Sequence, residues 1–232
     1  MASAVHGVDF NSVSDRRFCL CAIQSLQEDV LKLTDEVGAV LQTRLSYLGA
    51  LSCPIEELVG TRPTDEQYGA VCFACRCYEA ECVAVRLLAR SETSAQQLGF
   101  KLLKRGFEKR VVESVFPVLK RYSWLDDTRF ARAWLRNRVD SRPASRAQLL
   151  GELKRRGVSH ADAEGALDLL FQEQDEETLC LRLLEKLRRR GYGPHTLQRA
   201  LQRRQFSPSL VRRCLAVETE GACGPPCSAF SS

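Results

Sequence analysis

The chain has 232 residues, of which 44% are hydrophobic, 7% aromatic and 27% charged. This composition is ordinary for a folded protein, and the length suits one large domain or two small ones. No stretch approaches the roughly 18 consecutive apolar residues that a membrane-spanning helix needs, and the N-terminus has no basic and then apolar signal pattern. These features predict a cytoplasmic protein that does not enter a membrane.

The net charge of +5 is unevenly distributed along the chain. Residues 1–83 contain six Lys/Arg and twelve Asp/Glu, whereas residues 84–217 contain 28 and 15. A strongly basic region attracts an acidic or polyanionic partner. The sequence therefore predicts such a partner for residues 84–217, and it leaves open that the acidic N-terminal segment docks on them instead.

One pattern occurs three times in the basic region. Its anchors are Leu102, Leu153 and Leu201, which are 51 and 48 residues apart. Each anchor follows another leucine by four residues and is followed, after one further residue, by a basic pair: Lys104/Arg105, Arg155/Arg156 and Arg203/Arg204. An apolar run with helical spacing comes next in every copy. Repetition at this period is typical of a tandem array of helical modules.

Each module is predicted to hold three helices, here termed A, B and C. The A, B and C helices cover residues 64–90, 95–105 and 109–121, then 127–138, 145–156 and 160–173, and finally 175–190, 194–204 and 208–217. The predicted modules are residues 64–126, 127–174 and 175–217, followed by a disordered Gly/Pro/Ser-rich tail at 218–232. The predicted fold class is therefore mainly α.

Residues 1–63 form an acidic N-terminal segment whose secondary structure has two interpretations. In the first, residues 18–23, 30–34 and 39–42 are strands, and the last two form a short β-hairpin. In the second, an amphipathic helix covers residues 23–37, because apolar residues recur there with helical spacing. We favour the strands, and we expect a short helix at 55–59 between two breaks rich in Pro and Gly.

Three local features carry specific expectations. Gly106 follows the first B helix and is expected to end it in a left-handed conformation, which costs little without a Cβ. Gln205 replaces that glycine in the third module, so this helix end is expected to differ most. Pro117, inside the first C helix, is expected to kink that helix or end it early. Asp127 is expected to cap the second A helix, with Asp126 favouring its N-terminus.

Four of the eleven cysteines fall within the first A helix: Cys72, Cys75, Cys77 and Cys82. Cys-x2-Cys is a zinc-ligand spacing, yet neither a second zinc knuckle nor a His pair follows. Three of the four share the apolar side of the helix. We therefore favour reduced, buried cysteines and predict no metal and no cofactor.

The adjacent carboxylates of Asp126 and Asp127 are a possible site for acid–base or metal chemistry. Adjacent residues at the start of a helix point in different directions, however, and neither a third ligand nor a Gly-rich phosphate loop accompanies them. The sequence therefore predicts a protein without catalytic residues.

A candidate interface consists of thirteen basic residues of the three modules. They are Lys104, Arg105, Arg129, Arg132, Arg136, Arg138, Arg142, Arg146, Lys154, Arg155, Arg156, Arg203 and Arg204. Cations at a helix C-terminus complement the helix dipole by about 0.3–1 kcal/mol, which is enough to explain any single pair. Arg132 and Arg136 share one helix face, where like charges destabilise a helix slightly. Because this cost is accepted, we predict that the charge of Arg132 and Arg136 has a function. Contact with a phosphate backbone, or with an acidic protein groove beside one, would fit.

Several segments resemble the RecX family, the regulatory proteins that modulate the RecA recombinase. The most specific is Trp124-Leu125-Asp126-Asp127-Thr128-Arg129-Phe130-Ala131, and the others are residues 101–107 and 152–158 with Ala166-Leu167 after them. The resemblance covers about residues 84–217. The chain departs from the family's usual residues at four places: Thr93-Ser94, Gln97, Ser123-Trp124 in place of Gly-Tyr, and Gln205 in place of Gly.

The resemblance implies an elongated, curved array of three-helix modules in the groove of the RecA–single-stranded DNA filament. There it would restrain ATP hydrolysis, strand exchange and filament growth in recombination, DNA repair and the SOS response, without catalysing a reaction. The implied partner is the RecA nucleoprotein filament, with direct contact to single- or double-stranded DNA as an option, and the protein is expected to be a monomer. The alternative is an autonomous helical array whose basic face binds nucleic acid with little sequence specificity.

Overall fold

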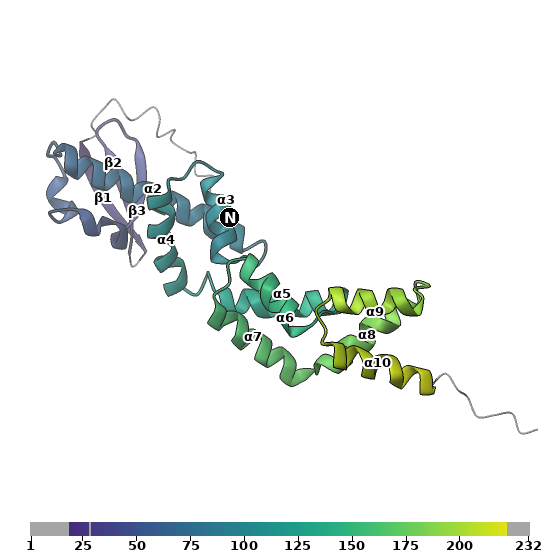
Figure 1. Cartoon of the computed structure of the whole chain (residues 1–232). Helices are drawn as coiled ribbons and strands as arrows, with labels where there is room; N and C mark the ends of the chain where they lie inside the picture. The colour runs from purple at the N-terminus through teal and green to yellow at the C-terminus, as the bar shows by residue number, and fades with distance from the viewer. Residues whose placement is uncertain (1–18, 28, 222–232) are drawn as a thin grey trace, which may run out of the picture. The chain divides into compact units, whose positions relative to one another are not determined.

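A computed structural model describes residues 19–27 and 29–221 of the chain (Figure 1). Apart from a small N-terminal sheet these residues are mostly helical, which confirms the mainly α class. They form two compact units, one from residues up to Ser91 with Leu98–Leu125, the other from Glu92–Gln97 with the residues from Asp126 onward. Within this part of the chain no helix is long and apolar enough to cross a bilayer.

The first unit begins with a three-stranded antiparallel sheet of strands β1 (Leu20–Gln27), β2 (Val30–Asp35) and β3 (Val40–Arg44), in that order. Leu33, in the centre of β2, pairs with Ile23 of β1 and Leu41 of β3. The β2–β3 turn is closed by Asp35, whose Oδ1 accepts two N–H groups of the turn at 3.0 and 2.6 Å. The strand interpretation is therefore confirmed, and the helix over residues 23–37 is wrong.

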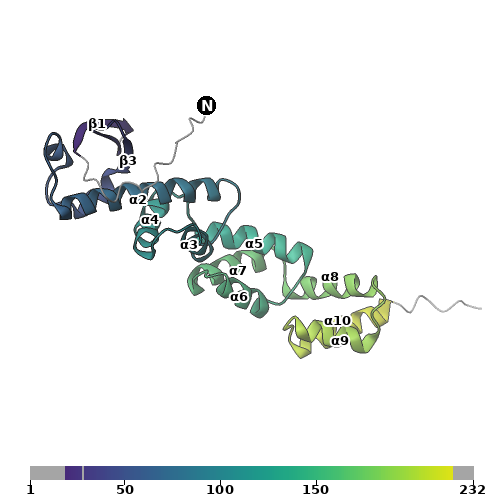
Figure 2. The same cartoon turned by 90° about the horizontal axis from the view of Figure 1, so that it is seen from above.

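Helix α2 (Asp65–Leu88) packs on the sheet and lies beside it in both views (Figures 1 and 2). Two short 3₁₀ helices, η1 (Leu45–Ala50) and η2 (Ile55–Leu58), connect the sheet to α2. Thr64 starts α2 with a capping box, because its hydroxyl accepts the N–H of Gln67 and the Gln67 side chain accepts the N–H of Thr64. This reciprocal pair satisfies two amides that a helix start leaves without partners.

Helices α3 (Ala95–Leu103) and α4 (Lys109–Arg121) supply the B and C helices of the first module. Gly99 lets the two approach closely, since a Cβ at this position would lie 3.3 Å from the Phe116 ring. Helix α4 continues through Pro117 to Arg121, so the predicted early end is wrong. Pro117 and Glu113 are both exposed, and water can therefore replace the hydrogen bond that Pro117 cannot donate.

The second unit holds the remaining helices of the array. They are α5 (Asp127–Ser141), α6 (Arg146–Arg155), α7 (His160–Glu173), α8 (Glu176–Arg188), α9 (Pro194–Arg203) and α10 (Pro208–Gly221). Leu153 of α6 and Leu201 of α9 are fully buried in one core shared by both modules. Helix α10 takes in residues 218–221 of the predicted tail, and the rest of that tail lies outside the described residues.

The B helices α3, α6 and α9 contact one another through their ends. The carbonyl oxygen of Arg156, at the end of α6, accepts a hydrogen bond from the Ser94 hydroxyl, at the start of α3, at 2.5 Å. The carbonyl oxygen of Arg204, at the end of α9, accepts one from the Ser145 N–H, at the start of α6, at 3.2 Å. The C-terminal end of each later B helix therefore sits on the N-terminal end of the one before it. We call this contact the B-helix joint.

A carboxylate from the following A helix completes each joint. Asp127 Oδ1 accepts the Ala95 N–H at 2.8 Å, and Glu176 Oε1 accepts the Arg146 N–H at 3.0 Å. Both amides belong to a first helical turn, which has no partner within its own helix. Asp126, and not Asp127, caps α5, by accepting two N–H groups of its first turn. The prediction that Asp127 caps the second A helix is wrong because its carboxylate serves α3, 32 residues earlier.

Left-handed residues follow the B helices of all three modules. Gly106 and Gly157 have φ values of 84° and 80°, and Gln205 has a φ of 60°. The third B helix therefore ends like the other two, and the expected difference at Gln205 is wrong. Ser123, at the position where the RecX family usually has glycine, has a φ of 55°. An L-residue in this conformation is less stable by roughly 1–2 kcal/mol, which a glycine avoids.

We expect Gln205→Gly and Ser123→Gly each to raise the free energy of unfolding by about 0.5–1 kcal/mol. The reason is that relief of the left-handed strain exceeds the extra chain entropy of glycine. Gly106 has open space around its missing Cβ, so Gly106→Ala should lower the free energy of unfolding by a similar amount. Urea titrations followed by circular dichroism measure all three changes. A destabilising Gln205→Gly would show that contacts of the Gln205 side chain outweigh its backbone strain.

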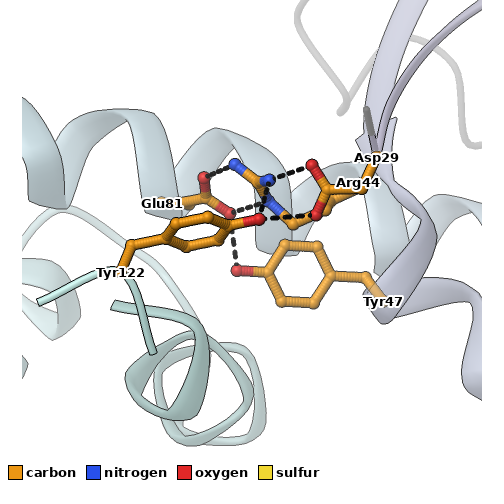
Figure 3. A network of polar contacts seen from close by, with 5 residues as sticks. All are labelled: Asp29, Arg44, Tyr47, Glu81 and Tyr122. Carbon is orange, nitrogen blue, oxygen red and sulfur yellow. Dashed lines mark hydrogen bonds and ion pairs between the residues drawn. The ribbon is translucent and has the colours of Figure 1, made fainter. Parts of the chain in front are cut away.

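A buried polar network connects the sheet, α2 and the end of α4 within the first unit (Figure 3). Arg44, the last residue of β3, donates to both carboxylate oxygens of Glu81 on α2, at 3.0 and 2.5 Å, and also contacts Asp29. The Tyr47 hydroxyl donates to Glu81 at 2.8 Å, and the Tyr122 hydroxyl donates to Asp29 at 2.9 Å. Arg44 and Glu81 are only 6% and 2% exposed. Their charges are therefore compensated by each other and by these neighbours.

Removing the carboxylate from this network should be strongly destabilising. We expect Glu81→Ala to lower the free energy of unfolding by about 3–5 kcal/mol, because the buried Arg44 loses its main counter-charge. Glu79→Ala is the matched control on the same helix: Glu79 is exposed and pairs only with Arg76, so its loss should change stability by less than about 1 kcal/mol. Equal effects of the two substitutions in urea unfolding would contradict this role of the network.

Candidate nucleic-acid and partner interface

The predicted interface cations fall in both units. Lys104 and Arg105 follow α3 in the first unit, and both are exposed. The other eleven lie in the second unit, on α5, α6, α9 and the connections next to them. The second unit therefore carries most of the predicted interface, and the contacts there divide its cations into two groups.

Arg138 is bound within the protein. Its guanidinium donates to both carboxylate oxygens of Glu152 at 2.9 Å, and the two side chains are 13% and 12% exposed. Burial alone would raise the pKa of Glu152, but hydrogen bonds from Arg138 and Gln148 hold this pKa below its usual range. A bidentate pair in this partly dry position fixes α5 against α6. Arg138 is thus a structural residue first.

Arg146 and Arg156 are also engaged by neighbouring residues. Arg146 donates to Asp168 at 2.6 Å and pairs with Glu164. Burial alone would lower the pKa of Arg146, and these two carboxylates raise it instead. The Arg156 guanidinium lies over the Trp134 ring, 4.3 Å from its centroid. Both arginines therefore stabilise the second unit and are less available to a partner than their exposure on a helix suggests.

Two further cations form pairs at the surface. Arg129 binds Glu92 at 2.5 Å, and Arg136 lies 4.0 Å from Glu173. All four side chains are exposed, and exposed pairs contribute only about 0–1 kcal/mol. A phosphate could replace either carboxylate at little cost.

Five exposed predicted cations of the second unit make no ion pair with any residue in the described part of the chain. They are Arg132, Arg142, Lys154, Arg155 and Arg203, here called the free cations, and all five are exposed. Like charges that have no counter-charge within the protein raise the local positive potential. The free cations are the part of the predicted interface that is open to an anionic partner.

Arg204 lies near Arg138 and Arg142, close to the second B-helix joint. The Arg138 guanidinium contacts the carbonyl oxygen of Arg142, and the carbonyl oxygen of Arg204 accepts the Ser145 N–H. Burial lowers the pKa of Arg204, and the positive charges of Arg138 and Arg142 lower it further, while Glu152 opposes them. Three cations beside one carboxylate leave net positive charge at a half-buried position. An anion would be stabilised there more than at the open surface.

The acidic residues that pair with some of the predicted interface cations were not identified from the sequence. Glu152, Glu164 and Asp168 stand among basic residues, and their arginine partners are 14 to 22 residues away. Pairs of this separation leave no i, i+4 signal on one helix. Contacts between helices were needed to separate bound cations from the free cations.

The cysteines of α2 are placed in the interior of the first unit. Cys75 and Cys77 are buried, and Cys72 and Cys82 are partly buried. Burial raises the pKa of Cys77 to about 12, so its thiol stays protonated at neutral pH. Among the described residues, no three His, Cys, Asp or Glu side chains are placed to share a metal ion. The geometry of α2 therefore fits packing thiols better than metal ligands.

Comparison with known proteins points to one family. A family model described as RecX, second three-helix domain, matches residues 126–167. The regulatory protein RecX of Treponema pallidum (strain Nichols) is 99% identical over 164 residues, which are 71% of this chain and all of that protein. The regulatory protein RecX of Halorhodospira halophila is 33% identical over 144 residues, which are 59% of this chain and 86% of that protein.

Solved structures share the fold. A crystal structure of a regulatory protein RecX aligns with a TM-score of 0.65 over 86% of this chain and 99% of that chain, at 18% identity. RecX from Lactobacillus salivarius aligns with a TM-score of 0.54 over 62% of this chain and 97% of that chain, at 15% identity. At these identities the likeness concerns the fold and not individual side chains.

The division between bound and free cations makes a direct prediction for two arginines of α5. Arg138→Ala should lower the free energy of unfolding by about 1–3 kcal/mol, because Glu152 loses its bidentate donor. Arg132→Ala removes a free cation and should change stability by less than about 0.5 kcal/mol. Urea unfolding of both variants tests the division, and it fails if Arg132→Ala is as destabilising as Arg138→Ala.

Proposed function

Because the chain belongs to the RecX family of regulatory proteins, we propose that it regulates a RecA recombinase in the cytoplasm by binding the RecA–single-stranded DNA filament. Binding lowers the rates of ATP hydrolysis and strand exchange by the filament during recombination and DNA repair. The protein acts as a monomer and catalyses no reaction itself. The observation that carries the proposal is the set of free cations on the modules that this family shares.

The chemistry of the free cations suits a phosphate backbone. Each cation that contacts a phosphate releases condensed counterions, so binding is favoured by their entropy and weakens as salt rises. Arg132 and Arg136 are four residues apart on α5 and thus share a helix face. Arg136 can exchange its distant surface carboxylate for a phosphate, whereas Arg132 has no carboxylate to lose. The second unit supports such contacts without giving up a buried ion pair.

The adjacent carboxylates support regulation by binding. Asp126 accepts amides of α5, and Asp127 accepts the first amide of α3. Each carboxylate is occupied by a helix end, where a negative charge is stabilised by the helix dipole. Neither is presented to a substrate as an acid or a base.

A second function, autonomous nucleic-acid binding with little sequence specificity, is supported by the same free cations and by the position of Arg204 between two other arginines. The two functions differ in their need for the recombinase. A filament regulator also contacts protein, so it keeps acting at ionic strengths where purely electrostatic DNA binding is weak. Salt dependence therefore separates the two.

A titration of RecA's DNA-dependent ATPase tests the proposal. We expect sub-stoichiometric protein to depress the ATPase at a salt concentration where the protein's own binding to single-stranded DNA is weak. Tight, salt-sensitive DNA binding with no effect on the ATPase would favour the autonomous binder instead.

Charge reversal tests the assignment of the interface in the same assay. The triple variant Arg132→Glu, Arg142→Glu, Arg203→Glu should raise the half-inhibiting concentration by about tenfold or more, equivalent to about 1.4 kcal/mol. It should also reduce the slope of log affinity against log salt by up to about 3. The matched control is Arg62→Glu, Arg90→Glu, Lys120→Glu, three exposed cations outside the predicted interface with the same change in net charge. Equal losses in the two triple variants would mean that net charge, and not this surface, matters.

A further inference from the structure

The C-terminal end of α3 is equivalent to the C-terminal ends of α6 and α9, which are both bound in B-helix joints. Arg156 and Arg204, which end the second and third B helices, each have a carbonyl oxygen bound in a B-helix joint. The residue at the same position of the first module is Arg105. Among the described residues no B helix precedes α3, so the joint has no counterpart there.

At the end of α3, Arg76 of α2 donates to the Gly106 carbonyl oxygen at 3.3 Å, but the carbonyl oxygen of Arg105 is uncovered. Among the described residues, none donates a hydrogen bond to the carbonyl oxygen of Arg105. A Cβ added to Gly157 would lie 2.2 Å from the Gln96 side chain, whereas one added to Gly106 would meet nothing within 4 Å. The same helix end is therefore packed in the second module and open in the first.

Two large apolar side chains lie exposed beside this open end. Phe100 is 64% exposed and Leu103 is 42% exposed, and residues three apart share a helix face. The second module has Gly151 and Lys154 at these positions, and the third has Arg199 and Gln202. Only the first B helix adds an apolar pair to the pattern. Exposed apolar residues next to a rim of charge, here Lys104 and Arg105, are typical of a protein-binding surface.

We propose that the end of α3, formed by Phe100, Leu103, Lys104, Arg105 and Gly106, docks the N-terminal end of a helix on the partner protein. Both internal joints seat a C-terminal helix end on a serine-capped helix start that also holds a carboxylate. The external helix is accordingly one with a hydroxyl N-cap, an acidic first turn and an apolar residue that packs on Phe100 and Leu103. An amide of this helix binds the free carbonyl oxygen of Arg105, and its acidic turn faces Lys104 and Arg105.

The B-helix start that has no joint in a second copy does not supply such a helix, whereas the start of α2 has Thr64 as N-cap and two acidic residues in its first turn. The cross-linking test below therefore includes a second copy as an outcome. The B-helix start left without a joint is that of α9, which begins with Gly193 and Pro194. Gly193 has no hydroxyl, Pro194 has no N–H, and the first turn of α9 has no acidic residue. This B-helix start therefore lacks the hydroxyl, the first helical amide and the carboxylate that the joints use.

A nucleic acid suits the end of α3 less well than a protein helix does. The C-terminal end of a helix carries partial negative charge on its free carbonyl groups, which disfavours a phosphate and favours a helix N-terminus. The Phe100 ring can stack on a base, but Leu103 beside it cannot, whereas an apolar side chain of a helix can pack on both. The proposed partner is thus the protein component of the filament, and this identification rests on the proposed function.

The test compares the double variant Phe100→Ser, Leu103→Ser with the wild-type chain in the ATPase titration. We expect the half-inhibiting concentration to rise at least about tenfold, and the loss to persist at high salt because the removed contact is apolar. Leu169→Ser is the matched control, since Leu169 is an exposed leucine (39%) on α7 in the second unit. It should leave inhibition unchanged. Unchanged urea midpoints for all variants confirm that only a surface has been altered.

The outcomes separate this inference from the proposed function. Wild-type protein that fails to inhibit the ATPase overturns the proposed function, and with it the identity of the partner. Inhibition by the wild type and by the double variant at the same concentration overturns the docking surface alone. A photo-reactive benzoylphenylalanine at position 100 gives a second readout on the assembled filament. Cross-links to the first turn of a recombinase helix support the proposal, and cross-links to DNA or to a second copy of this chain overturn it.

Discussion

The B-helix joint is the contact on which the arrangement of the second unit depends. Every helix leaves carbonyl groups at one end and amides at the other without partners, and burying such groups unpaired would be costly. The joint satisfies groups of two helices at once, because a carbonyl oxygen at a C-terminal end accepts a hydrogen bond from a serine hydroxyl or N–H at an N-terminal end. The Ser94–Arg156 and Ser145–Arg204 bonds join equivalent helix ends, with a hydroxyl as donor in the first and a backbone N–H in the second. Contact between successive B helices thus rests on backbone groups at the helix ends and, in the first joint, on the Ser94 hydroxyl.

The joint also explains why the two members of a basic pair behave differently. Arg156 and Arg204 are half-buried and their carbonyl groups are held in a joint, whereas Arg155 and Arg203 are exposed free cations. In the first module, where no joint forms, Arg105 is exposed like its neighbour. One repeated dipeptide therefore has two roles: its second residue belongs to the contact between modules, and its first residue remains available to a partner.

The helices were predictable because their signals are local. Residues 109–121 and 160–173 have the observed bounds, since apolar spacing and caps lie within each segment. The strands were ambiguous because the apolar residues of 23–37 fit both a helix and a strand, and only the neighbouring strands decide between them. The role of Asp127 was missed because its partner is in another module. The cations could be listed from the sequence, but their division required acids that reach them across helices.

The positions of glycine show how far such local rules hold. A glycine after a B helix predicts a left-handed residue, and Gln205 adopts the same conformation without being glycine. The packing of α9 and α10 on α8 sets this turn, so the backbone accepts strain that local preference opposes. At the start of α9 the reverse applies, because Gly193 and Pro194 stand where a joint would need a hydroxyl and a helix amide. The third module thus has the same backbone conformation after its B helix as the others but lacks the hydroxyl and the amide with which a B-helix start forms a joint. The end of α3 is different. It has the carbonyl oxygen that a joint would use, on Arg105, and it adds the exposed apolar pair of Phe100 and Leu103, which suits a binding surface.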